Sequence, residues 1–196
     1  MEGRFYLLPL NSKRDKHDYV IFYFDDYELH FNDPRLFGKM EVVLKEDIDK
    51  FFNSKKLGLE YTDPKLTVNY LKEKFKTHHT DIKKMLLDQS YITGIGNIYA
   101  DEVLFASKIN PLRLGESVTL EECKRIIKSA RDILSLAIKE GGTTIRSYTS
   151  SLGVTGNYQN FLKVHKKEGE LCTCGCKIEK IKVGGRSTYF CPNCQK

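Results

Sequence analysis

Apolar and polar positions follow two different periods along this chain, and the change divides it into a strand-rich start and a helical middle. Residues 1–45 are predicted to form strands. Tyr19–Phe24 is apolar on both faces and rich in β-branched and aromatic residues, which predicts a strand that is buried on two sides. The Asp25-Asp26 pair then predicts a turn into Tyr27–Phe31, and therefore a hairpin. Lys39–Val43 is expected to form another strand.

From about Leu66 the period becomes helical. A short helix is predicted over Ile82–Leu87 and a second over Ile98–Ala106, with the turn Gly94-Ile-Gly96-Asn97 between them. The strongest helical pattern begins at Thr119-Leu-Glu-Glu122, which has the spacing of a capping box. Apolar residues then recur at spacings of three and four as far as Ile138, and Gly141-Gly142 end the helix. Cys123 lies on this apolar stripe and is expected to be an ordinary core residue.

Five of the six cysteines lie in two short groups near the end of the chain, Cys172-Thr-Cys174-Gly-Cys176 and Cys191-Pro-Asn-Cys194. Two thiolate pairs at this separation can surround one tetrahedral Zn²⁺. Because few apolar residues lie between the two groups, the metal would substitute for a core. A pair of disulfides is the alternative. The lack of a signal peptide and the single Cys123 favour a reducing cytosol, and therefore zinc.

Length and charge narrow the class of protein. A chain of 196 residues with 40% hydrophobic content is long enough for one large domain or two small ones. No apolar run reaches the ~18 residues that a membrane span needs, so no membrane partner is expected. The net charge is +6, and residues 161–196 carry eight Lys and Arg against three Glu. A basic zinc ribbon favours a polyanionic partner such as nucleic acid, although a solvated lysine surface would have the same charge.

The turn between the two predicted short helices has the chemistry of a phosphate site. Gly94 and Gly96 allow a tight turn and a close approach of the backbone to another molecule. Amide groups at the start of the following helix have no partner within the helix and suit an anion, and Asn97 adds a side-chain donor. Most turns of this composition are only turns, so the motif is not specific by itself.

Residues 86–105 closely resemble the helix–two-turn–helix segment of formamidopyrimidine-DNA glycosylases. Further segments resemble the same family in the same order: Lys16-His17-Asp18, Asn32–Gly38, Gly141–Ile145, Gly153–Asn160 and Ile178–Gln195. Because several long motifs agree in order, the chain is identified as a member of this family; the endonuclease VIII branch is less similar.

The resemblance implies an α+β fold in three parts. We expect a partial β-sandwich, a remnant of the family's N-terminal domain, over residues 1–50. A helix–two-turn–helix DNA-binding domain is expected over 60–165, and a zinc-finger β-hairpin over 166–196.

The resemblance also implies a function. Family members excise oxidised purines such as 8-oxoguanine and formamidopyrimidines, and then cleave the strand at the abasic site. A glycosylase must extrude its target nucleotide, because the scissile bond is inaccessible inside the base stack. We therefore expect base excision repair on double-stranded DNA that contains oxidised bases or abasic sites. The protein is expected to be a zinc-binding monomer in the cytoplasm, associated with the nucleoid.

Carried over residue by residue, the family motifs give the expected site. Met1, Arg35 and Phe37 would fill the gap left by the extruded base, although Arg35 and Phe37 also fit an ordinary turn with a buried aromatic. Residues 150–160 match the loop that covers that base. Phosphate contacts fall on His17, Lys83, Asn97 and Arg186. For His17 and Lys83, the sequence fits a solvated surface side chain equally well. Arg186 also takes part in the second elimination step in the family, so it is the catalytic residue expected in this chain.

One departure from the family concerns the catalytic start. The family nucleophile is an N-terminal proline followed by a glutamate, with a catalytic lysine further on, and this chain has no match to any of the three. Met1-Glu2-Gly3 instead aligns with an internal family segment. We therefore expect the N-terminal catalytic segment to be missing, and the chain to bind damaged DNA without forming the proline Schiff base. The rival hypothesis is a non-enzymatic damaged-DNA-binding zinc protein. A more distant alternative is an RNA-binding zinc-ribbon protein, which would leave the matches at Arg35 and Phe37 unexplained.

A second departure concerns the first cysteine group. The family has two residues between its first two cysteines, and here one residue separates Cys172 from Cys174. Cys174 keeps the family register, with sixteen residues between it and Cys191. The expected ligands are Cys172, Cys174, Cys191 and Cys194. Cys176 is the expected substitute, because a Cys172/Cys176 pair would also have a spacing found in zinc sites.

Overall fold

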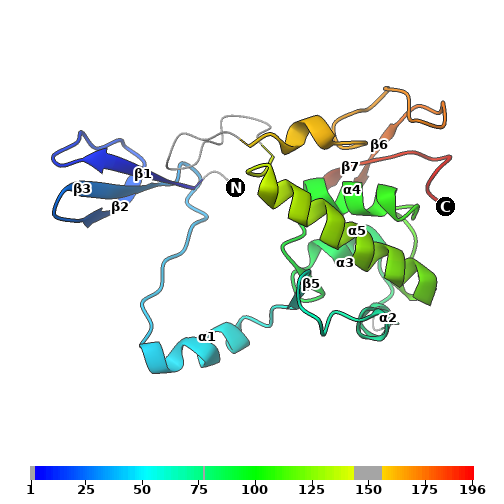
Figure 1. The fold of residues 1–196 in the computed structure, drawn as a ribbon, viewed down its shortest axis with the longest axis horizontal. Coiled ribbons are helices and arrows are strands. Elements are labelled where there is room, and N and C mark those ends of the chain that lie inside the picture. The colour runs from blue at the N-terminus through cyan, green and yellow to red at the C-terminus, as the bar shows by residue number, and fades with distance from the viewer. Residues whose placement is uncertain (1–2, 77, 144–155) are drawn as a thin grey trace. The chain divides into compact units, whose positions relative to one another are not determined.

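The computed structural model describes residues 3–76, 78–143 and 156–196, and it is a mixed α and β structure with small sheets (Figure 1). The helices are α1 Ile48–Ser54, α2 Val68–Lys76, α3 Ile82–Leu87, α4 Asn97–Ala106 and α5 Leu120–Lys139, with 3-10 turns at Lys45–Asp47, Gly115–Ser117 and Tyr158–Phe161. The strands are β1 Arg4–Pro9, β2 Asp18–Tyr23, β3 Tyr27–Asn32, β4 Leu59–Glu60, β5 Ile92–Thr93, β6 Glu179–Val183 and β7 Arg186–Phe190. The expected α+β class is therefore confirmed.

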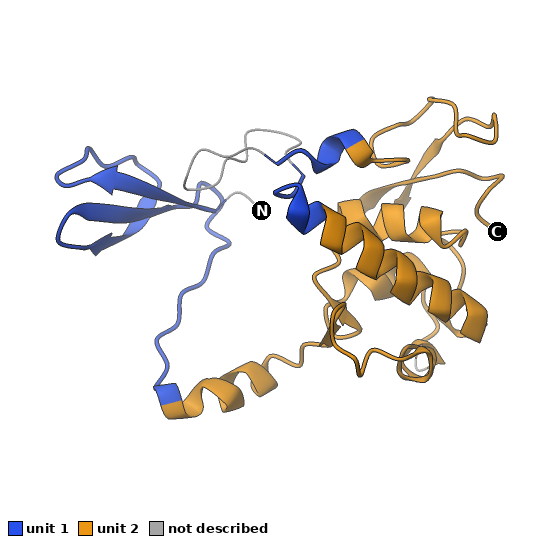
Figure 2. Ribbon diagram, viewed as in Figure 1, with its two compact units in different colours: residues 1–45, 137–160 blue, residues 46–136, 161–196 orange. Residues whose placement is uncertain are grey.

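The chain divides into two compact units (Figure 2). Unit 1 contains Met1–Lys45 and Ala137–Asn160, and unit 2 contains Glu46–Leu136 and Phe161–Lys196. One of the three boundaries along the chain, between Leu136 and Ala137, therefore falls within the last turn of α5.

Unit 1 contains an antiparallel sheet in the order β1-β3-β2. The predicted hairpin of β2 and β3 is present, and its turn is closed by a hydrogen bond from the Phe24 amide to the Tyr27 carbonyl at 3.0 Å. The prediction that Tyr19–Phe24 is buried on two sides is wrong. Tyr19, Phe22 and Tyr23 are 49%, 41% and 67% exposed, and within the described residues β2 is an edge strand that pairs with β3 alone.

The prediction of a further strand over Lys39–Val43 is also wrong. This segment has no regular secondary structure, and it pairs with no strand in the described part of the chain. Its alternating charged and apolar residues have the period of a strand, but its apolar side chains Met40, Val42 and Val43 are exposed. A strand pattern needs a partner strand to supply its hydrogen bonds, and here none lies beside it.

Unit 2 is built around the helices α2, α3, α4 and α5. Their apolar faces form one core that includes Phe75 of α2, Met85 of α3, Leu104 of α4 and Ile126 of α5. The predicted helices over Ile82–Leu87 and Ile98–Ala106 are confirmed as α3 and α4, and Cys123 is fully buried in the core as expected. Burial raises the pKa of the Cys123 thiol to about 11.

The longest helix, α5, has the predicted start and stop. The Thr119 amide donates to Glu122 Oε2 at 2.8 Å and the Glu122 amide donates to Thr119 Oγ1 at 3.2 Å, which is the reciprocal pattern of a capping box. At the other end Gly141 and Gly142 have φ values of 72° and 87°, in the left-handed region that favours glycine. The Gly142 amide donates to the Ala137 carbonyl at 2.7 Å, and the helix ends at Lys139.

The last part of unit 2 is the antiparallel hairpin of β6 and β7, which the sequence predicted between the two cysteine groups. A second, smaller hydrophobic cluster supports it. Val164, Ile178 and Tyr189 are buried there beside Cys172 and Cys191, and Phe105 of α4 packs against them. This cluster connects the cysteine-bearing segment to the end of α4.

Candidate metal centre and nucleic-acid interface

Four cysteine sulfurs converge at the open end of the β6–β7 hairpin. The Sγ atoms of Cys172, Cys174, Cys191 and Cys194 all lie within 4.8 Å of one another. Cys174 Sγ is 3.5 Å from Cys191 Sγ, and Cys172 Sγ is 3.8 Å from Cys194 Sγ. Four sulfurs at ~2.3 Å from a tetrahedral zinc ion would be about 3.8 Å apart. The donor set and its spacing therefore fit Zn²⁺, and these are the four cysteines expected as ligands.

A tight turn brings the first cysteine group to this position. The Cys172 amide donates to the Cys176 carbonyl, the Gly175 amide donates to the Cys172 carbonyl, both at 2.8 Å, and Gly175 has a φ of 85°. Hydrogen bonds, the largest from the Asn193 side chain and the next from the Cys176 amide, lower the pKa of the Cys174 thiol to about 6. At Cys174 the lowered pKa favours the thiolate, which is the form that binds a metal. Burial raises the pKa of Cys191, and the hydrogen bond with Cys174 raises the pKa of Cys194. Cys176 is outside the group of four sulfurs and packs against the small hydrophobic cluster.

The turn between α3 and α4 is shaped by Gln89. Its Nε2 donates to the Ile95 carbonyl at 2.9 Å, and its Oε1 accepts from the Gly94 amide at 2.8 Å. Gly94 has a φ of 92°, and open space surrounds the positions where a Cβ would stand on Gly94 and Gly96. The backbone of this turn is therefore approachable from solvent, and the first amides of α4 have no partner within the helix.

Asn97, the first residue of α4, joins this turn to the zinc hairpin. Its Nδ2 donates to the Ser187 carbonyl of β7 at 3.0 Å. The same nitrogen has a second hydrogen, so it can donate to one further acceptor. Asn97 Oδ1 is buried and has no hydrogen-bond partner within the described residues.

Lys83 on α3 is more deeply buried than a surface phosphate contact would be. Its side chain is fully buried, and its Nζ pairs with the Asp101 carboxylate and donates to the Asn97 carbonyl at 3.3 Å. Burial lowers the pKa of Lys83, the Asp101 carboxylate opposes this shift, and the positive charge of Arg186 adds to it. Lys83, Asn97 and Arg186 therefore lie close together in unit 2.

Arg186 itself is exposed at the start of β7. It follows Gly184 and Gly185, which have φ values of 56° and 75° and form the tip of the hairpin. A Cβ on Gly184 would lie 3.3 Å from Lys84 Cγ, so the tip packs beside α3. The planar guanidinium of Arg186 has the geometry for a bidentate contact with a phosphate.

Three of the expected site residues that the structure describes lie in unit 1. His17 is half-buried, and its carbonyl accepts from the Asp33 amide at 3.0 Å. The Arg35 guanidinium lies 4.6 Å from the centre of the Phe37 ring, and Phe37 is 55% exposed, so the alternative of a buried aromatic does not hold. The Asp33 carboxylate organises this loop by accepting from the amides of Gly38 at 2.6 Å and Arg35 at 3.3 Å. These bonds, the one from Gly38 first, lower the pKa of Asp33.

Met1 and residues 150–155 of the expected base-covering loop lie outside the described residues. Of the rest of that loop, Tyr158 is buried, and its amide donates to the Gly142 carbonyl at 3.0 Å.

Sequence reasoning missed the acidic pair of α4. Glu102 accepts the amides of Lys163, Val164 and His165 at 2.8 to 3.0 Å, and so fixes the entry into the zinc-binding segment. Asp101 Oδ2 pairs with His165 Nδ1 at 2.6 Å while its other oxygen pairs with Lys83. Two adjacent acidic residues on an otherwise apolar helix were the available signal, because buried carboxylates need partners.

Among the described helices, none combines the length and the apolar character that a bilayer span would require.

Comparisons with known proteins cover the whole chain. The family model for the formamidopyrimidine-DNA glycosylase H2TH domain matches residues 57–149, and the model for the zinc finger found in FPG and IleRS matches residues 164–196. The formamidopyrimidine-DNA glycosylase of Listeria monocytogenes is 46% identical over 198 residues, which is all of this chain and 72% of that protein. The Bacillus cereus protein of the same name is 45% identical, with 71% of its length covered.

The similar solved structures are proteins of the same kind. The Lactococcus lactis Fpg in complex with DNA containing an abasic site has a TM-score of 0.93 and 41% identity, covering all of this chain and 72% of that one. The G226P mutant of the same protein, in complex with DNA containing Fapy-dG, has a TM-score of 0.94 and 40% identity, with the same coverage. The matching zinc-finger family and the four converging sulfurs together identify the cysteine group as a Zn²⁺ site. With this identity over its full length and both family domains present, the chain belongs to the formamidopyrimidine-DNA glycosylase family.

Proposed function

We propose that this chain binds double-stranded DNA containing an oxidised purine or an abasic site, and that it acts in base excision repair at the nucleoid. The observation that carries the proposal is the bond from Asn97 to the Ser187 carbonyl, which holds the turn before α4 beside the hairpin bearing Arg186. Solved relatives that are 40–41% identical bind DNA with an abasic site or Fapy-dG, which supports the same ligand here.

In this proposal the zinc ion has a structural role, held by Cys172, Cys174, Cys191 and Cys194. When bound, it fixes the two cysteine groups and so orients the hairpin. The parts of the chain are a sandwich portion over 1–50, a helix–two-turn–helix domain over 60–165 and a zinc finger over 166–196.

The phosphate backbone would be contacted by Asn97, Arg186 and His17, with the second hydrogen of Asn97 Nδ2 available for one bond. Lys83 contributes a positive charge beneath the same turn, and it reaches a phosphate directly only if its Nζ leaves the Asp101 carboxylate. Arg35 and Phe37, together with Met1, would fill the gap left by the extruded base. Arg186 is also proposed to act in the second elimination step.

Excision in this family is proposed to need a proline amine as nucleophile and a glutamate to move protons. The five prolines of these 196 residues are each followed by a residue other than glutamate. We therefore propose that a polypeptide of these residues binds the lesion without forming the covalent imine. A non-enzymatic role in damaged-DNA binding is the second candidate for a polypeptide of these residues.

Two assays test the proposal on the 196-residue protein. Fluorescence anisotropy with duplexes carrying 8-oxoguanine, an abasic-site analogue or no lesion should show preferential binding of the two damaged duplexes. Arg186→Ala should lower the slope of log affinity against log salt by ~0.9, the value for one lost phosphate contact. Lys182→Ala removes an exposed positive charge from the neighbouring strand β6 and should change this slope much less.

In the second assay, the duplex with 8-oxoguanine is incubated with the protein and borohydride. No covalent adduct is expected. A clear adduct would overturn the statement on the nucleophile, and equal affinity for damaged and undamaged duplexes would overturn the statement on the ligand.

A further inference from the structure

The side chain of Gln195 connects the second cysteine group to the helical part of unit 2. Gln195 is 1% exposed. Its Oε1 accepts from the Cys191 amide at 2.8 Å, and its Nε2 donates to the Ile109 carbonyl at 2.9 Å. A main-chain bond from the Gln195 amide to the Cys191 carbonyl at 3.0 Å closes the turn around Cys194. One side-chain amide therefore links the zinc ligand Cys191 to Ile109, which lies 86 positions before Gln195 in the sequence.

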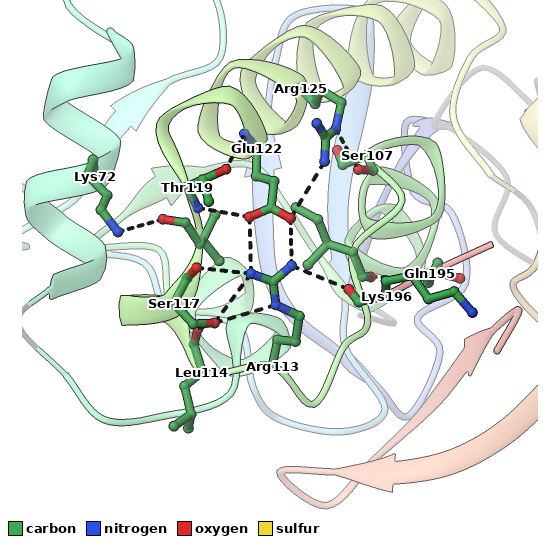
Figure 3. Close-up of polar contacts among 12 residues, drawn as sticks. Lys72, Ser107, Arg113, Leu114, Ser117, Thr119, Glu122, Arg125, Gln195 and Lys196 are labelled. Carbon is green, nitrogen blue, oxygen red and sulfur yellow. Dashed lines mark hydrogen bonds and ion pairs between the residues drawn. The ribbon is translucent and has the colours of Figure 1, made fainter. Parts of the chain in front are cut away.

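The main chain of Lys196 extends this connection (Figure 3). Its carbonyl accepts from the Asn110 amide at 2.9 Å and from Arg113 Nη1 at 3.4 Å, and its amide donates to the Lys108 carbonyl at 3.3 Å. Gln195 and Lys196 thus lie along the segment 108–113 that leaves α4.

Arg113 carries the connection on to α5. Its guanidinium makes a bidentate pair with Glu122, with Nη1 at 2.5 Å from Oε1 and Nη2 at 3.0 Å from Oε2. Glu122 in turn caps α5 through the Thr119 amide. A continuous series of polar contacts therefore runs from Cys191 to the first turn of α5, and Figure 3 shows its part from Lys196 through Arg113 and Glu122 to Thr119.

The groups that the Gln195 side chain bonds are buried, so these contacts form in only one arrangement of the turn from Cys191 to Cys194. Cys191 and Ile109 are both fully buried, so without Gln195 their amide and carbonyl groups would have no solvent to bond. The Cys191 amide points at Gln195 only while the turn from Cys191 to Cys194 keeps its shape. Zinc fixes both of these cysteines and therefore fixes that turn.

We infer that Gln195 is a positioning residue that couples zinc occupancy to the order of residues 108–113 and the start of α5. When zinc leaves, the turn at Cys191 relaxes, Gln195 loses its amide partner, and the segment that it holds is released. The part of this inference that concerns DNA rests on the proposed function, because the same coupling would orient the Arg186 hairpin against α4.

Amide hydrogen exchange, followed by mass spectrometry on the full chain, tests the coupling without DNA. We expect chelation of zinc to speed exchange in peptides covering 108–113 and 119–123. Gln195→Ala, with zinc still bound at one ion per chain, should speed exchange over 108–113 about tenfold, the effect of leaving buried groups unpaired. Lys196→Ala keeps the main-chain bonds of that residue and should leave this exchange unchanged.

A second variant covers the possibility that Gln195→Ala does not fold. Gln195→Glu keeps an acceptor for the Cys191 amide but places an oxygen against the Ile109 carbonyl. It should retain zinc and still speed exchange over 108–113. If chelation speeds exchange only within 164–196, or if both Gln195 variants leave 108–113 unchanged, the coupling is refuted.

The DNA readout separates this inference from the proposed function. Gln195→Ala should weaken binding to the abasic-site duplex without changing the salt slope, because no phosphate contact is removed. A lowered slope would mean that Gln195 contacts the phosphate backbone, and would overturn its assignment as a positioning residue. If the zinc-loaded wild-type protein binds no DNA, the proposed function fails, while the exchange result still decides the coupling.

Discussion

The carboxylate of Glu122 both caps α5 and pairs with Arg113, and both interactions lower its pKa. Burial alone would raise its pKa, but the bonds from Arg113 and from the Thr119 amide lower the pKa to about 2 (Figure 3). A folded-state pKa below the usual 4.5 means that the carboxylate contributes stability above pH 4.5. This contribution is lost as the pH falls from 4.5 towards 2.

We therefore expect Glu122→Gln to lower the free energy of unfolding by about 1–3 kcal/mol at pH 7, since it weakens the cap and leaves the Arg113 guanidinium without its charge partner. The loss should shrink as the pH falls from 4.5 towards 2. Urea unfolding followed by circular dichroism measures this. Glu121→Gln, at an exposed position one residue away, is the matched control and should change stability little. Equal losses in the two variants would contradict the assignment.

The pKa of His30 in unit 1 is shifted in the opposite direction from the pKa of Glu122. It is fully buried between Glu28 Oε2 at 2.8 Å and Asp18 Oδ2 at 2.9 Å. The bond to Glu28, then the bond to Asp18, raises the pKa of His30 above 6.5. Asp15 reaches the same group through the Asn32 side chain, and the charge of Arg14 acts on Glu28.

A raised folded-state pKa stabilises the sheet below pH 6.5, and the contribution is lost as the pH rises through the folded-state value. We expect the β3 amides, after correction for the intrinsic pH dependence of exchange, to exchange faster as the pH rises from 6 to 9. NMR exchange measurements test this, and His30→Gln should remove the dependence. The exposed His79, replaced in the same way, should leave it intact. A ring titration of His30 at or below pH 6.5 would refute the expectation.

At the scale of elements, the zinc hairpin shows how five nearby thiols separate into four and one. Cys172, Cys174, Cys191 and Cys194 bring their sulfurs together, whereas Cys176 contributes mainly a carbonyl to the turn and a side chain to the small hydrophobic cluster. The departure from family spacing therefore leaves a tetrahedral donor set intact.

Serine replacement at each cysteine should show this division. We expect one zinc ion per chain in the wild-type protein, in Cys176→Ser and in Cys123→Ser. A lower stoichiometry or a strongly raised sensitivity to chelators is expected for Cys172→Ser and Cys174→Ser, because oxygen is a poorer ligand than thiolate. Metal analysis of the purified proteins gives the count. Zinc loss in Cys176→Ser alone would exchange the roles of Cys174 and Cys176.

The helices were predictable because their signals are local. Thr119 and Glu122 are three residues apart, and the apolar stripe of α5 repeats within each turn, so the sequence predicts both its cap and its face. The strands were not predictable to the same degree. Lys39–Val43 has the alternation of a strand, but whether a partner lies beside it is decided by distant residues.

For the whole molecule, the contacts missing from sequence reasoning are those between segments far apart. The bonds from Gln195 to Ile109 and from Asn97 to Ser187 join residues 86 and 90 positions apart, and no spacing rule predicts them. The buried face of β3 is a second case. Glu28, His30 and Asn32 alternate with apolar residues, and an alternation rule would have placed them in solvent, yet they are the buried set. The cause is mutual pairing with Asp18 and its neighbours.

The depth of Lys83 has a chemical consequence for anyone labelling the protein. Acylating reagents attack uncharged amines that they can reach, and the Nζ of Lys83 is enclosed and bound to a carboxylate. Most lysines of the chain would react at rates set by solvent exposure. Lys83 would react only while α3 and α4 are transiently separated. Its acylation rate would therefore report how often that helix pair opens.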